Sequence, residues 1–396
     1  MSLPDTRPSR PTADGSRVTT GGPSAHSASN ADAKRTDPAG RSRSGSGPAG
    51  VQGALAVDGS PRASLEGLAG EAPLHQLAAA VAQWPRHFAS QDWITISYLV
   101  SLLVALMIGA GPNRGPCLVR VAGDLGFFLF VLALVRGPVL RWGSAASSLL
   151  YRTSIIGALL SSFFQLREIL PAVSPWTDDA RIYAFDLTAF GFEPSVVLDR
   201  YVAPATTEWF AFFYFLYFLI LCVHVLPMVY WQPDGALLGR FATGMLLIFM
   251  TAHLLYMVVP GFGPYWYLAG TFGHELRGGT FWRLVREAVE AGGAQKDIFP
   301  SLHTAVPTYL AVFSFRHRKV ALFKYWWPVI AFVATQIIIA TMFLRWHYLI
   351  DVVAGLLLAV AGSLIGQHVS DWEHAKRARL GLQPVWTPLV YPWSRG

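Results

Sequence analysis

The sequence predicts an all-α membrane protein, a polytopic bundle of about eight transmembrane helices. Of its 396 residues, 53% are hydrophobic and only 14% are charged, whereas soluble domains carry about 25% charged residues. The mean hydropathy is +0.39. The apolar residues also gather in blocks long enough to cross the roughly 30 Å hydrocarbon core of a bilayer. Both observations favour a chain that folds within a membrane.

The two ends of the chain differ from this apolar middle. Residues 1–75 are rich in Ser, Gly, Ala, Pro and Arg and lack Phe, Trp and Tyr. Such a segment cannot bury enough apolar surface to offset its conformational entropy, so we expect a disordered cytosolic tail. Residues 76–370 are expected to form the membrane-embedded bundle, and residues 371–396 a second cytosolic tail.

Eight apolar blocks follow the first tail, and each is expected to form one transmembrane helix. Their approximate bounds are 93–109, 118–135, 144–166, 209–231, 241–260, 302–315, 325–344 and 348–365. The sixth block is short and contains Pro307, which predicts a kinked helix. Between the blocks, residues 280–292 are typical of an amphipathic helix, and residues 194–202 of a second short helix. Either could cover a membrane-embedded site or simply pack at the interface.

The basic residues of the short loops predict the orientation. They are Arg136, Arg141, Arg240, Arg316, Arg318, Lys319, Lys324, Lys376, Arg377 and Arg379. An even number of spans places all of them, and the N-terminus, on one side, which the positive-inside rule makes cytoplasmic. The net charge of +7 is then accounted for by the tail and these loops, and we expect no nucleic-acid partner. The turn at 345–347 and the long loops at 167–207 and 261–300 face outward.

The first motif with chemical content opens the sixth block and reads Phe299-Pro300-Ser301-Leu302-His303. Ser301 can cap a helix that begins here. The start of that helix aims free backbone N–H groups outward, which suits an anion. His303 then lies in the first turn, beside the anion. The alternative is a helix cap with an interfacial histidine.

The second motif opens the eighth block and reads Arg345-Trp346-His347-Tyr348-Leu349-Ile350-Asp351. His347 and Asp351 are four residues apart, so on a helix they share one face and can hydrogen-bond. A carboxylate that holds one imidazole nitrogen fixes the tautomer and leaves the other nitrogen free to attack. The alternative is a structural pair that ties two helices together, although a carboxylate inside an apolar helix is costly unless paired.

The two motifs are expected to meet, because block six descends from the outer face and block seven returns to it. Two histidines, one carboxylate and one arginine at an anion-binding helix start are typical of phosphoryl transfer. The sequence contains no HExxH and no cysteine cluster, so we expect neither a metal nor another cofactor.

The pair FPSLHTA and HYLIDVVAG, about forty residues apart, resembles the type 2 phosphatidic acid phosphatase superfamily. Within it, the chain looks closest to the inositol phosphorylceramide synthase branch, which commonly has leucine, here Leu302, where the phosphatases have glycine. Residues 186–194 and 260–265 also resemble that branch. The resemblance covers about residues 180–366.

This resemblance implies a six-helix core and a role for each residue of the two motifs. His347 would be the nucleophile and would form a phosphohistidine, and Asp351 would orient it. His303 would protonate the leaving alcohol and then deprotonate the incoming acceptor. Ser301 would hydrogen-bond the phosphate. Members of this superfamily work without a metal.

The chain departs from the phosphatases in its positive charges. Residues 260–265 contain neither the lysine nor the arginine of the phosphatases' first motif, and Thr341 occupies the position of another arginine. Basic residues elsewhere in the chain must then bind the negatively charged phosphate. Arg345, two residues from His347, is the first choice, and Lys296 is the second.

The sequence therefore predicts an integral membrane enzyme of lipid-phosphate metabolism whose site faces the outer side. Its partners would be a lipid phosphate and the surrounding membrane lipids, with water or a small alcohol such as inositol as the acceptor; the resemblance favours transfer to an alcohol. The alternative is a non-catalytic lipid transporter or scaffold that retains the motifs, which the displaced basic residues suggest. The oligomeric state, the lipid and the acceptor are left open.

Overall fold

The computed structural model describes residues 87–137, 143–292 and 295–389, and every named element within them is a helix. The described residues belong to one of the two compact units of the chain, residues 60–396. The expected tail at 1–75 lies outside the described residues, as do residues 390–396 of the expected C-terminal tail.

The helices follow one another along the chain with short connections. They are α3 (Ser90–Ile108), α4 (Arg114–Arg136), α5 (Ala145–Val173), α6 (Asp179–Phe190), α7 (Pro194–Leu198), η2 (Asp199–Tyr201), α8 (Pro204–Leu226), η3 (Pro227–Trp231), α9 (Gly235–Val258), α10 (Pro264–Tyr267), α11 (Thr280–Gly292), α12 (Leu302–Arg316), α13 (Ala321–Lys324), α14 (Trp327–Phe343) and α15 (Leu349–Arg379).

Each of the eight predicted blocks coincides with one helix, which confirms the all-α polytopic fold. Among the described residues, six helices are long and apolar enough to cross a membrane, namely α3, α4, α5, α8 with η3, α9 and α15. The other two blocks form shorter helices, α14 with 17 residues and α12 with 15 residues and Pro307 inside it. The protein is thus an integral membrane protein.

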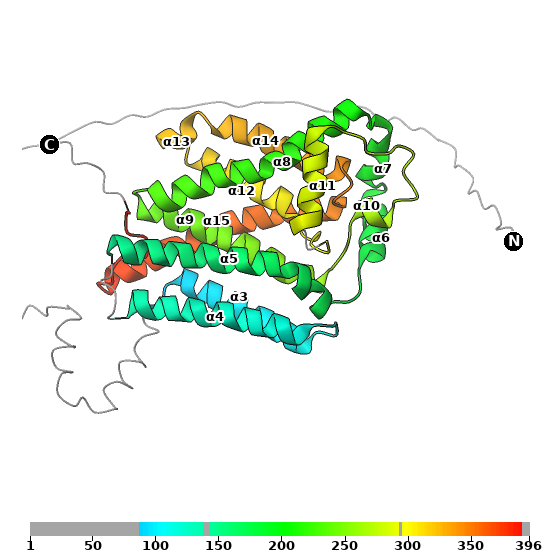
Figure 1. Cartoon of the computed structure of the whole chain (residues 1–396). Helices are drawn as coiled ribbons and strands as arrows, with labels where there is room; N and C mark the ends of the chain where they lie inside the picture. Colours follow the sequence, from blue (N-terminus) through cyan, green and yellow to red (C-terminus); the bar gives the residue numbers. More distant parts are fainter. Residues whose placement is uncertain (1–86, 138–142, 293–294, 390–396) are drawn as a thin grey trace, which may run out of the picture. The chain divides into compact units, whose positions relative to one another are not determined.

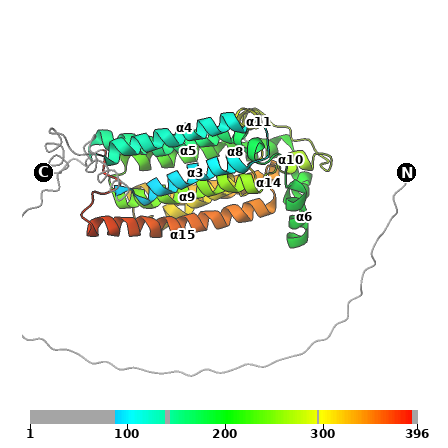
Figure 2. The same cartoon turned by 90° about the horizontal axis from the view of Figure 1, so that it is seen from below.

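The long helices lie side by side in a bundle, whereas α6 crosses one end of it (Figures 1 and 2). Helix α9 packs on α15, α12 packs on α14 and α15, and α3 packs on α4 and α9. Glycine allows α9 and α15 to approach closely, because a Cβ on Gly366 would lie only 2.6 Å from the backbone of Gly244. Small residues bring membrane helices together in this way.

The bundle has two chemically distinct ends. Helices α12 and α15 begin at one of them, which we call the histidine end. Helix α15 has 31 residues and so extends about 45 Å at 1.5 Å per residue. Its last turns therefore lie at the opposite end, which we call the far end.

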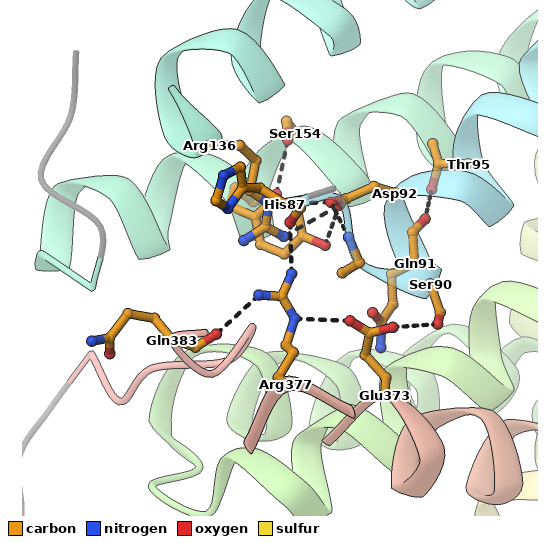
Figure 3. Close-up of polar contacts among 12 residues, drawn as sticks. His87, Ser90, Gln91, Asp92, Thr95, Arg136, Ser154, Glu373, Arg377 and Gln383 are labelled. Carbon is orange, nitrogen blue, oxygen red and sulfur yellow. Dashed lines mark hydrogen bonds and ion pairs between the residues drawn. The ribbon is translucent and has the colours of Figure 1, made fainter. Parts of the chain in front are cut away.

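A buried network of ion pairs joins four helices at the far end (Figure 3). Asp92 of α3 accepts hydrogen bonds from Arg136 Nε of α4 at 3.1 Å and from the Tyr151 hydroxyl of α5 at 2.6 Å. On α15, Glu373 accepts a hydrogen bond from Arg377 Nε at 2.8 Å. All five side chains are at most 5% exposed. The Ser90 hydroxyl of α3 donates to Glu373 at 2.7 Å, and this contact connects the end of α15 to the first three helices.

Candidate active site

The starts of α12 and α15 are joined directly, which brings the two histidine motifs together. Ser301 is the N-cap of α12, and its hydroxyl oxygen accepts from the Thr304 N–H at 3.2 Å. The Ser301 N–H donates to the Asp351 carbonyl at 3.0 Å. Among the described residues, no hydrogen bond occupies the backbone N–H groups of Leu302 and His303. These groups are available to an anion, as the sequence predicts.

His303 is held by two tyrosine rings of α8. The Tyr214 ring stacks on the imidazole at 4.3 Å between centroids and 15° between planes, and the Tyr217 ring lies at 4.3 Å. The Tyr214 hydroxyl lies 3.4 Å from Nδ1. Nε2 is buried and has no partner among the described residues. The rings of His303 and His347 lie 6.2 Å apart between centroids, close enough for both to reach one phosphoryl group.

His347 lies in the turn between α14 and α15, one helical turn before Asp351. Its Nδ1 is 3.5 Å from Asp351 Oδ2, which is longer than a hydrogen bond. Asp351 Oδ2 instead accepts from the Tyr348 N–H at 2.9 Å. Burial lowers the pKa of His347 to about 4, against the opposing field of Asp297. The imidazole is therefore neutral at pH 7, the form that a nucleophile needs.

Two carboxylates of α6 hold the start of α15. Asp186 accepts hydrogen bonds from the N–H groups of Leu349 at 2.6 Å and Ile350 at 3.1 Å. Asp179 accepts from the Tyr348 hydroxyl at 3.1 Å. The first N–H groups of α15 are thus already occupied, which leaves the start of α12 as the anion-binding helix end.

Arg345 braces the histidine turn from outside the cavity described below. Its backbone takes the left-handed conformation, with φ at 66°, which non-glycine residues adopt only when their surroundings hold them there. Its guanidinium group donates to Asp199 Oδ1 at 2.7 Å and to the His274 carbonyl at 2.6 Å, and it lies 3.8 Å from the centre of the Phe272 ring. The side chain predicted to bind phosphate is therefore paired with a carboxylate.

Lys296, the second predicted cation, is also held by the protein. Its Nζ donates to the carbonyls of Ser174, Pro175 and Trp176 at 3.1, 3.3 and 3.1 Å, respectively. These carbonyls follow the end of α5. Lys296 thus ties the first histidine motif to α5, and it does not line the cavity, whereas its neighbour Asp297 does.

A cavity of about 680 Å³ extends from the two histidines into the bundle. Asp297, His303 and His347 line its histidine end, and Arg152 and Trp386 line its other end. Most of the surface between them is apolar. It includes Ile155, Leu159, Phe163, Phe218, Leu221, Val225, Met245 and Phe249 from α5, α8 and α9.

The cavity is open sideways between α5 and α8. Helix α5 packs on α4, α3 and α9, whereas α8 packs on α14, α11 and α12. Cavity-lining side chains on both helices are exposed, with Leu160 at 49%, Phe164 at 63% and Phe218 at 43%. In a bundle that spans a membrane, such an opening faces lipid chains.

Helix α11 covers the histidine end, and its bounds agree with the amphipathic helix predicted at 280–292. Glu208 of α8 accepts from the N–H groups of Gly279 and Phe281, each at 2.7 Å, and so holds the start of α11. Val285 and Val289 point into the cavity. The short helix predicted at 194–202 is also confirmed, as α7 and η2.

Sequence reasoning did not single out the carboxylates of this site other than Asp351. Asp297 follows Lys296 directly, four residues before Ser301, where an exposed charged pair in a loop is the ordinary interpretation. Asp179, Asp186 and Asp199 are equally inconspicuous, because each sits in a loop or amphipathic segment where a solvated carboxylate is ordinary. Only the fold brings them to the turn around His347.

The fold and the site define a polytopic membrane helix bundle with two histidines at one end of an apolar cavity. Residues 181–365 match the family model of the PAP2 superfamily. The matched part contains α8, α9, α12, α14, the start of α15 and both histidine motifs, whereas α3, α4 and α5 lie before it. No curated protein and no solved structure matches the chain. The superfamily indicated by the motifs is thus supported, and the inositol phosphorylceramide synthase branch stays a prediction.

Proposed function

We propose that the protein is an integral membrane enzyme that transfers a phosphoryl or phospho-alcohol group from a lipid phosphate through a covalent intermediate on His347. The match to the PAP2 superfamily supports a phosphatase or phosphotransferase of lipid phosphates. One observation carries the proposal further. The same cavity joins the histidine pair to an apolar channel that is open between α5 and α8, so that a lipid can place its phosphate at His347 and its chains in the membrane.

In the first half of the reaction, the neutral imidazole of His347 attacks phosphorus and forms a nitrogen–phosphorus bond. The bond between phosphorus and the oxygen of the lipid alcohol breaks, and His303, which enters the step protonated, donates its proton to that oxygen and becomes neutral. The N–H groups of Leu302 and His303 bind the phosphate oxygens from the start of α12. Asp351, 3.5 Å from the His347 ring, stabilises the positive charge that the ring acquires.

In the second half, water or an alcohol attacks the phosphohistidine. His303 removes a proton from the incoming hydroxyl, the nitrogen–phosphorus bond breaks, and His347 returns to its neutral form. The 6.2 Å between the two rings leaves room for one phosphoryl group between nucleophile and acid–base. The resemblance to the inositol phosphorylceramide synthase branch favours an alcohol over water.

In this proposal, uncharged hydrogen-bond donors stabilise the negative charge of the phosphate. Arg345 and Lys296 are bound to Asp199 and to backbone carbonyls, so they act by holding the two motifs in place. Trp346 Nε1 is a further donor, because it is buried without a partner in a ring that lines the cavity. Ser301 contributes as the N-cap of α12, because its N–H donates to the Asp351 carbonyl and so links the starts of α12 and α15.

The site faces the outer side of the membrane in this proposal. The basic residues of the short loops and of the end of α15 lie at the far end, which the positive-inside rule makes cytoplasmic; among the described residues they are Arg136, Arg240, Arg316, Arg318, Lys319, Lys324, Lys376, Arg377 and Arg379. A lipid of the outer leaflet would then enter between α5 and α8 with its phosphate already at the depth of His347.

The test uses the purified full-length protein in lipid nanodiscs with a labelled lipid phosphate, with and without added alcohols. A labelled phospho-alcohol that appears only when the alcohol is present indicates transfer, and a water-soluble phosphate under every condition indicates hydrolysis. His347→Ala is expected to abolish turnover, whereas His368→Ala, an exposed histidine farther along α15, leaves it unchanged. Equal turnover in wild type and His347→Ala would contradict the role of His347, and a wild type without turnover would favour the scaffold.

A further inference from the structure

We propose that Asp297 forms a subsite for the ammonium group of an amino-alcohol headgroup, so that the lipid donor is a zwitterionic phosphodiester. This inference rests on the proposed function, since it names the substrate of the same site. It adds a residue and a chemical class that neither the family match nor the motifs assign.

The position of Asp297 is the first observation. Its side chain lines the cavity together with His303 and His347. Burial raises the pKa of the Asp297 carboxyl, and the nearby His347 ring opposes that shift. The backbone of Asp297 pairs with that of Gly261 in an isolated bridge. Asp297 and the next residue, Ile298, both line the cavity, whereas the Lys296 side chain is bound to the carbonyls that follow α5.

The absence of a partner is the second observation. Among the described residues, no ion pair and no side-chain hydrogen bond engages the Asp297 carboxylate. The two nearest cations in sequence or space, Lys296 and Arg345, are held by other groups. The one basic side chain that lines the cavity, Arg152, lies at its opposite end and donates to the carbonyls of Val229 and Thr387.

The charges that line the histidine end of the cavity favour some lipid phosphates over others. The histidine end of the cavity presents one carboxylate and only neutral phosphate donors. A phosphate monoester, which carries nearly two negative charges at pH 7, meets repulsion from Asp297. A phosphodiester carries one negative charge, and an ammonium group on the same headgroup can pair with Asp297. The site therefore matches a zwitterion, in which both charges find a complement.

The remaining walls favour an ammonium group over a polyol. Aromatic rings of Tyr256, Trp266 and Trp346 line the cavity, and aromatic faces attract alkylammonium groups. Each hydroxyl of a polyol such as inositol loses its water on entry and needs a hydrogen-bond partner of its own. One carboxylate among aromatic rings satisfies a single cation better than several hydroxyls.

The transfer step balances with this substrate. His347 attacks the phosphodiester, the bond to the diacylglycerol oxygen breaks, and that oxygen receives a proton from His303. The phospho-amino-alcohol stays on His347 with its ammonium group at Asp297. An acceptor hydroxyl then takes the group, gives its proton to His303 and releases His347. No oxidant, reductant or metal is consumed.

The test compares three lipids in nanodiscs of otherwise fixed composition: phosphatidylethanolamine, phosphatidylglycerol and phosphatidic acid. Wild type is expected to turn over phosphatidylethanolamine with a kcat/KM about tenfold to a hundredfold above the other two, the range of a charged hydrogen bond. Asp297→Asn removes that preference and spares phosphatidylglycerol. Asp297→Glu keeps the preference. Glu168→Gln, the same change at a half-exposed position of α5, alters nothing.

A second readout does not depend on turnover or on one variant. Equilibrium binding of phosphatidylcholine and phosphatidylglycerol is measured for wild type, Asp297→Asn and Asp297→Glu, each checked for folding by its melting temperature. Weaker binding of phosphatidylcholine in Asp297→Asn alone supports the subsite. Equal lipid preference in wild type and Asp297→Asn overturns the subsite and leaves the proposed function standing. A wild type that binds phosphatidylcholine selectively but turns over no lipid phosphate contradicts the proposed function and leaves the subsite standing.

Discussion

The two ends of the bundle differ in how their buried polar and charged groups are paired. At the far end, Asp92 accepts from Arg136 and from the hydroxyl of Tyr151, and Glu373 pairs with Arg377 (Figure 3). At the histidine end, His303 Nε2, His347 Nδ1 and Asp351 Oδ1 are buried without a partner among the described residues. One set of charges is matched within the protein, and the other is left open.

This difference separates structural from chemical roles. Buried polar atoms are almost always hydrogen-bonded in folded proteins, so several open ones in one place need an explanation. A phosphoryl group between the histidines would supply a partner for His303 Nε2, whereas His347 Nδ1 faces Asp351 at 3.5 Å. The far end also holds an unpartnered atom, Gln91 Oε1, but its carboxylates and guanidinium groups satisfy one another. Helix α15 reaches both ends, so the contrast arises from the residues that surround it at each end and not from the helix itself.

Replacement at the histidine end is expected to give the largest effect on chemistry and a smaller effect on folding. His303→Ala removes the proton donor and acceptor, and turnover should fall about 100- to 10,000-fold. The melting temperature should fall only moderately, because the lost contacts with the Tyr214 and Tyr217 rings are partly offset by the removal of an unpartnered buried nitrogen. Steady-state kinetics and thermal unfolding in detergent measure both. A large loss of stability with normal turnover per folded molecule would remove His303 from the site.

A replacement at the far end is expected to lower stability and to leave kcat unchanged. Arg136→Ala leaves Asp92 buried without its cation, and breaking such a pair costs about 3–5 kcal/mol of folding free energy. The kcat of the molecules that remain folded should be unchanged, since the network lies a bundle length from His347. Unfolding in denaturant, with kcat measured on the folded fraction, distinguishes the two effects. A reduced kcat at full stability would show that the ends are coupled.

A smaller effect is expected from the support of the histidine turn. Asp186→Ala removes the carboxylate that accepts from Leu349 and Ile350, and loss of a helix cap costs about 1 kcal/mol. The exchange of these two amide protons should become faster, and kcat should fall while KM changes little, because the nucleophile is less well placed. Unchanged exchange with unchanged kcat would show that α6 does not position His347.

The pH dependence follows from the lowered pKa of His347, about 4 instead of the usual 6.5. Turnover should persist at pH 5 and fail as the pH drops through about 4, where the nucleophile takes up a proton. The unfolded chain binds this proton already below 6.5, so stability falls as the pH drops from 6.5 to 4. Asp297→Asn removes the field that opposes the shift, and the acid limit should move to lower pH. An acid limit near 6.5 would show that His347 is not buried as described.

The helices of the eight apolar blocks, six of which are long enough to cross a membrane, could be predicted from the sequence because an apolar run is a signal that needs no tertiary knowledge. The meeting of His303 and His347 was also predictable. Both motifs start helices, and two spans separated by one return must begin at the same face. The amphipathic spacing of residues 280–292 predicted helix α11 and its bounds.

The partners of the two cations could not be predicted. Arg345 pairs with Asp199, which lies 146 residues earlier in the chain, and Lys296 binds carbonyls that follow α5. Sequence spacing places a charge near a histidine but does not show which way its side chain turns. Which of the two neighbours, Lys296 or Asp297, lines the cavity depends on the path of the backbone beside Gly261. That path cannot be read from the sequence.

The covalent intermediate is the central claim, and trapping it on His347 tests that claim directly. The protein is mixed with a lipid whose phosphate is radiolabelled, quenched in alkali, which preserves phosphohistidine, and digested for mapping of the label. The account predicts label on His347 in wild type and none in His347→Ala, and label that persists longer in Asp351→Asn or His303→Ala if any forms. Turnover of the lipid with no label on His347 at any time, or label on His303 in its place, would contradict it.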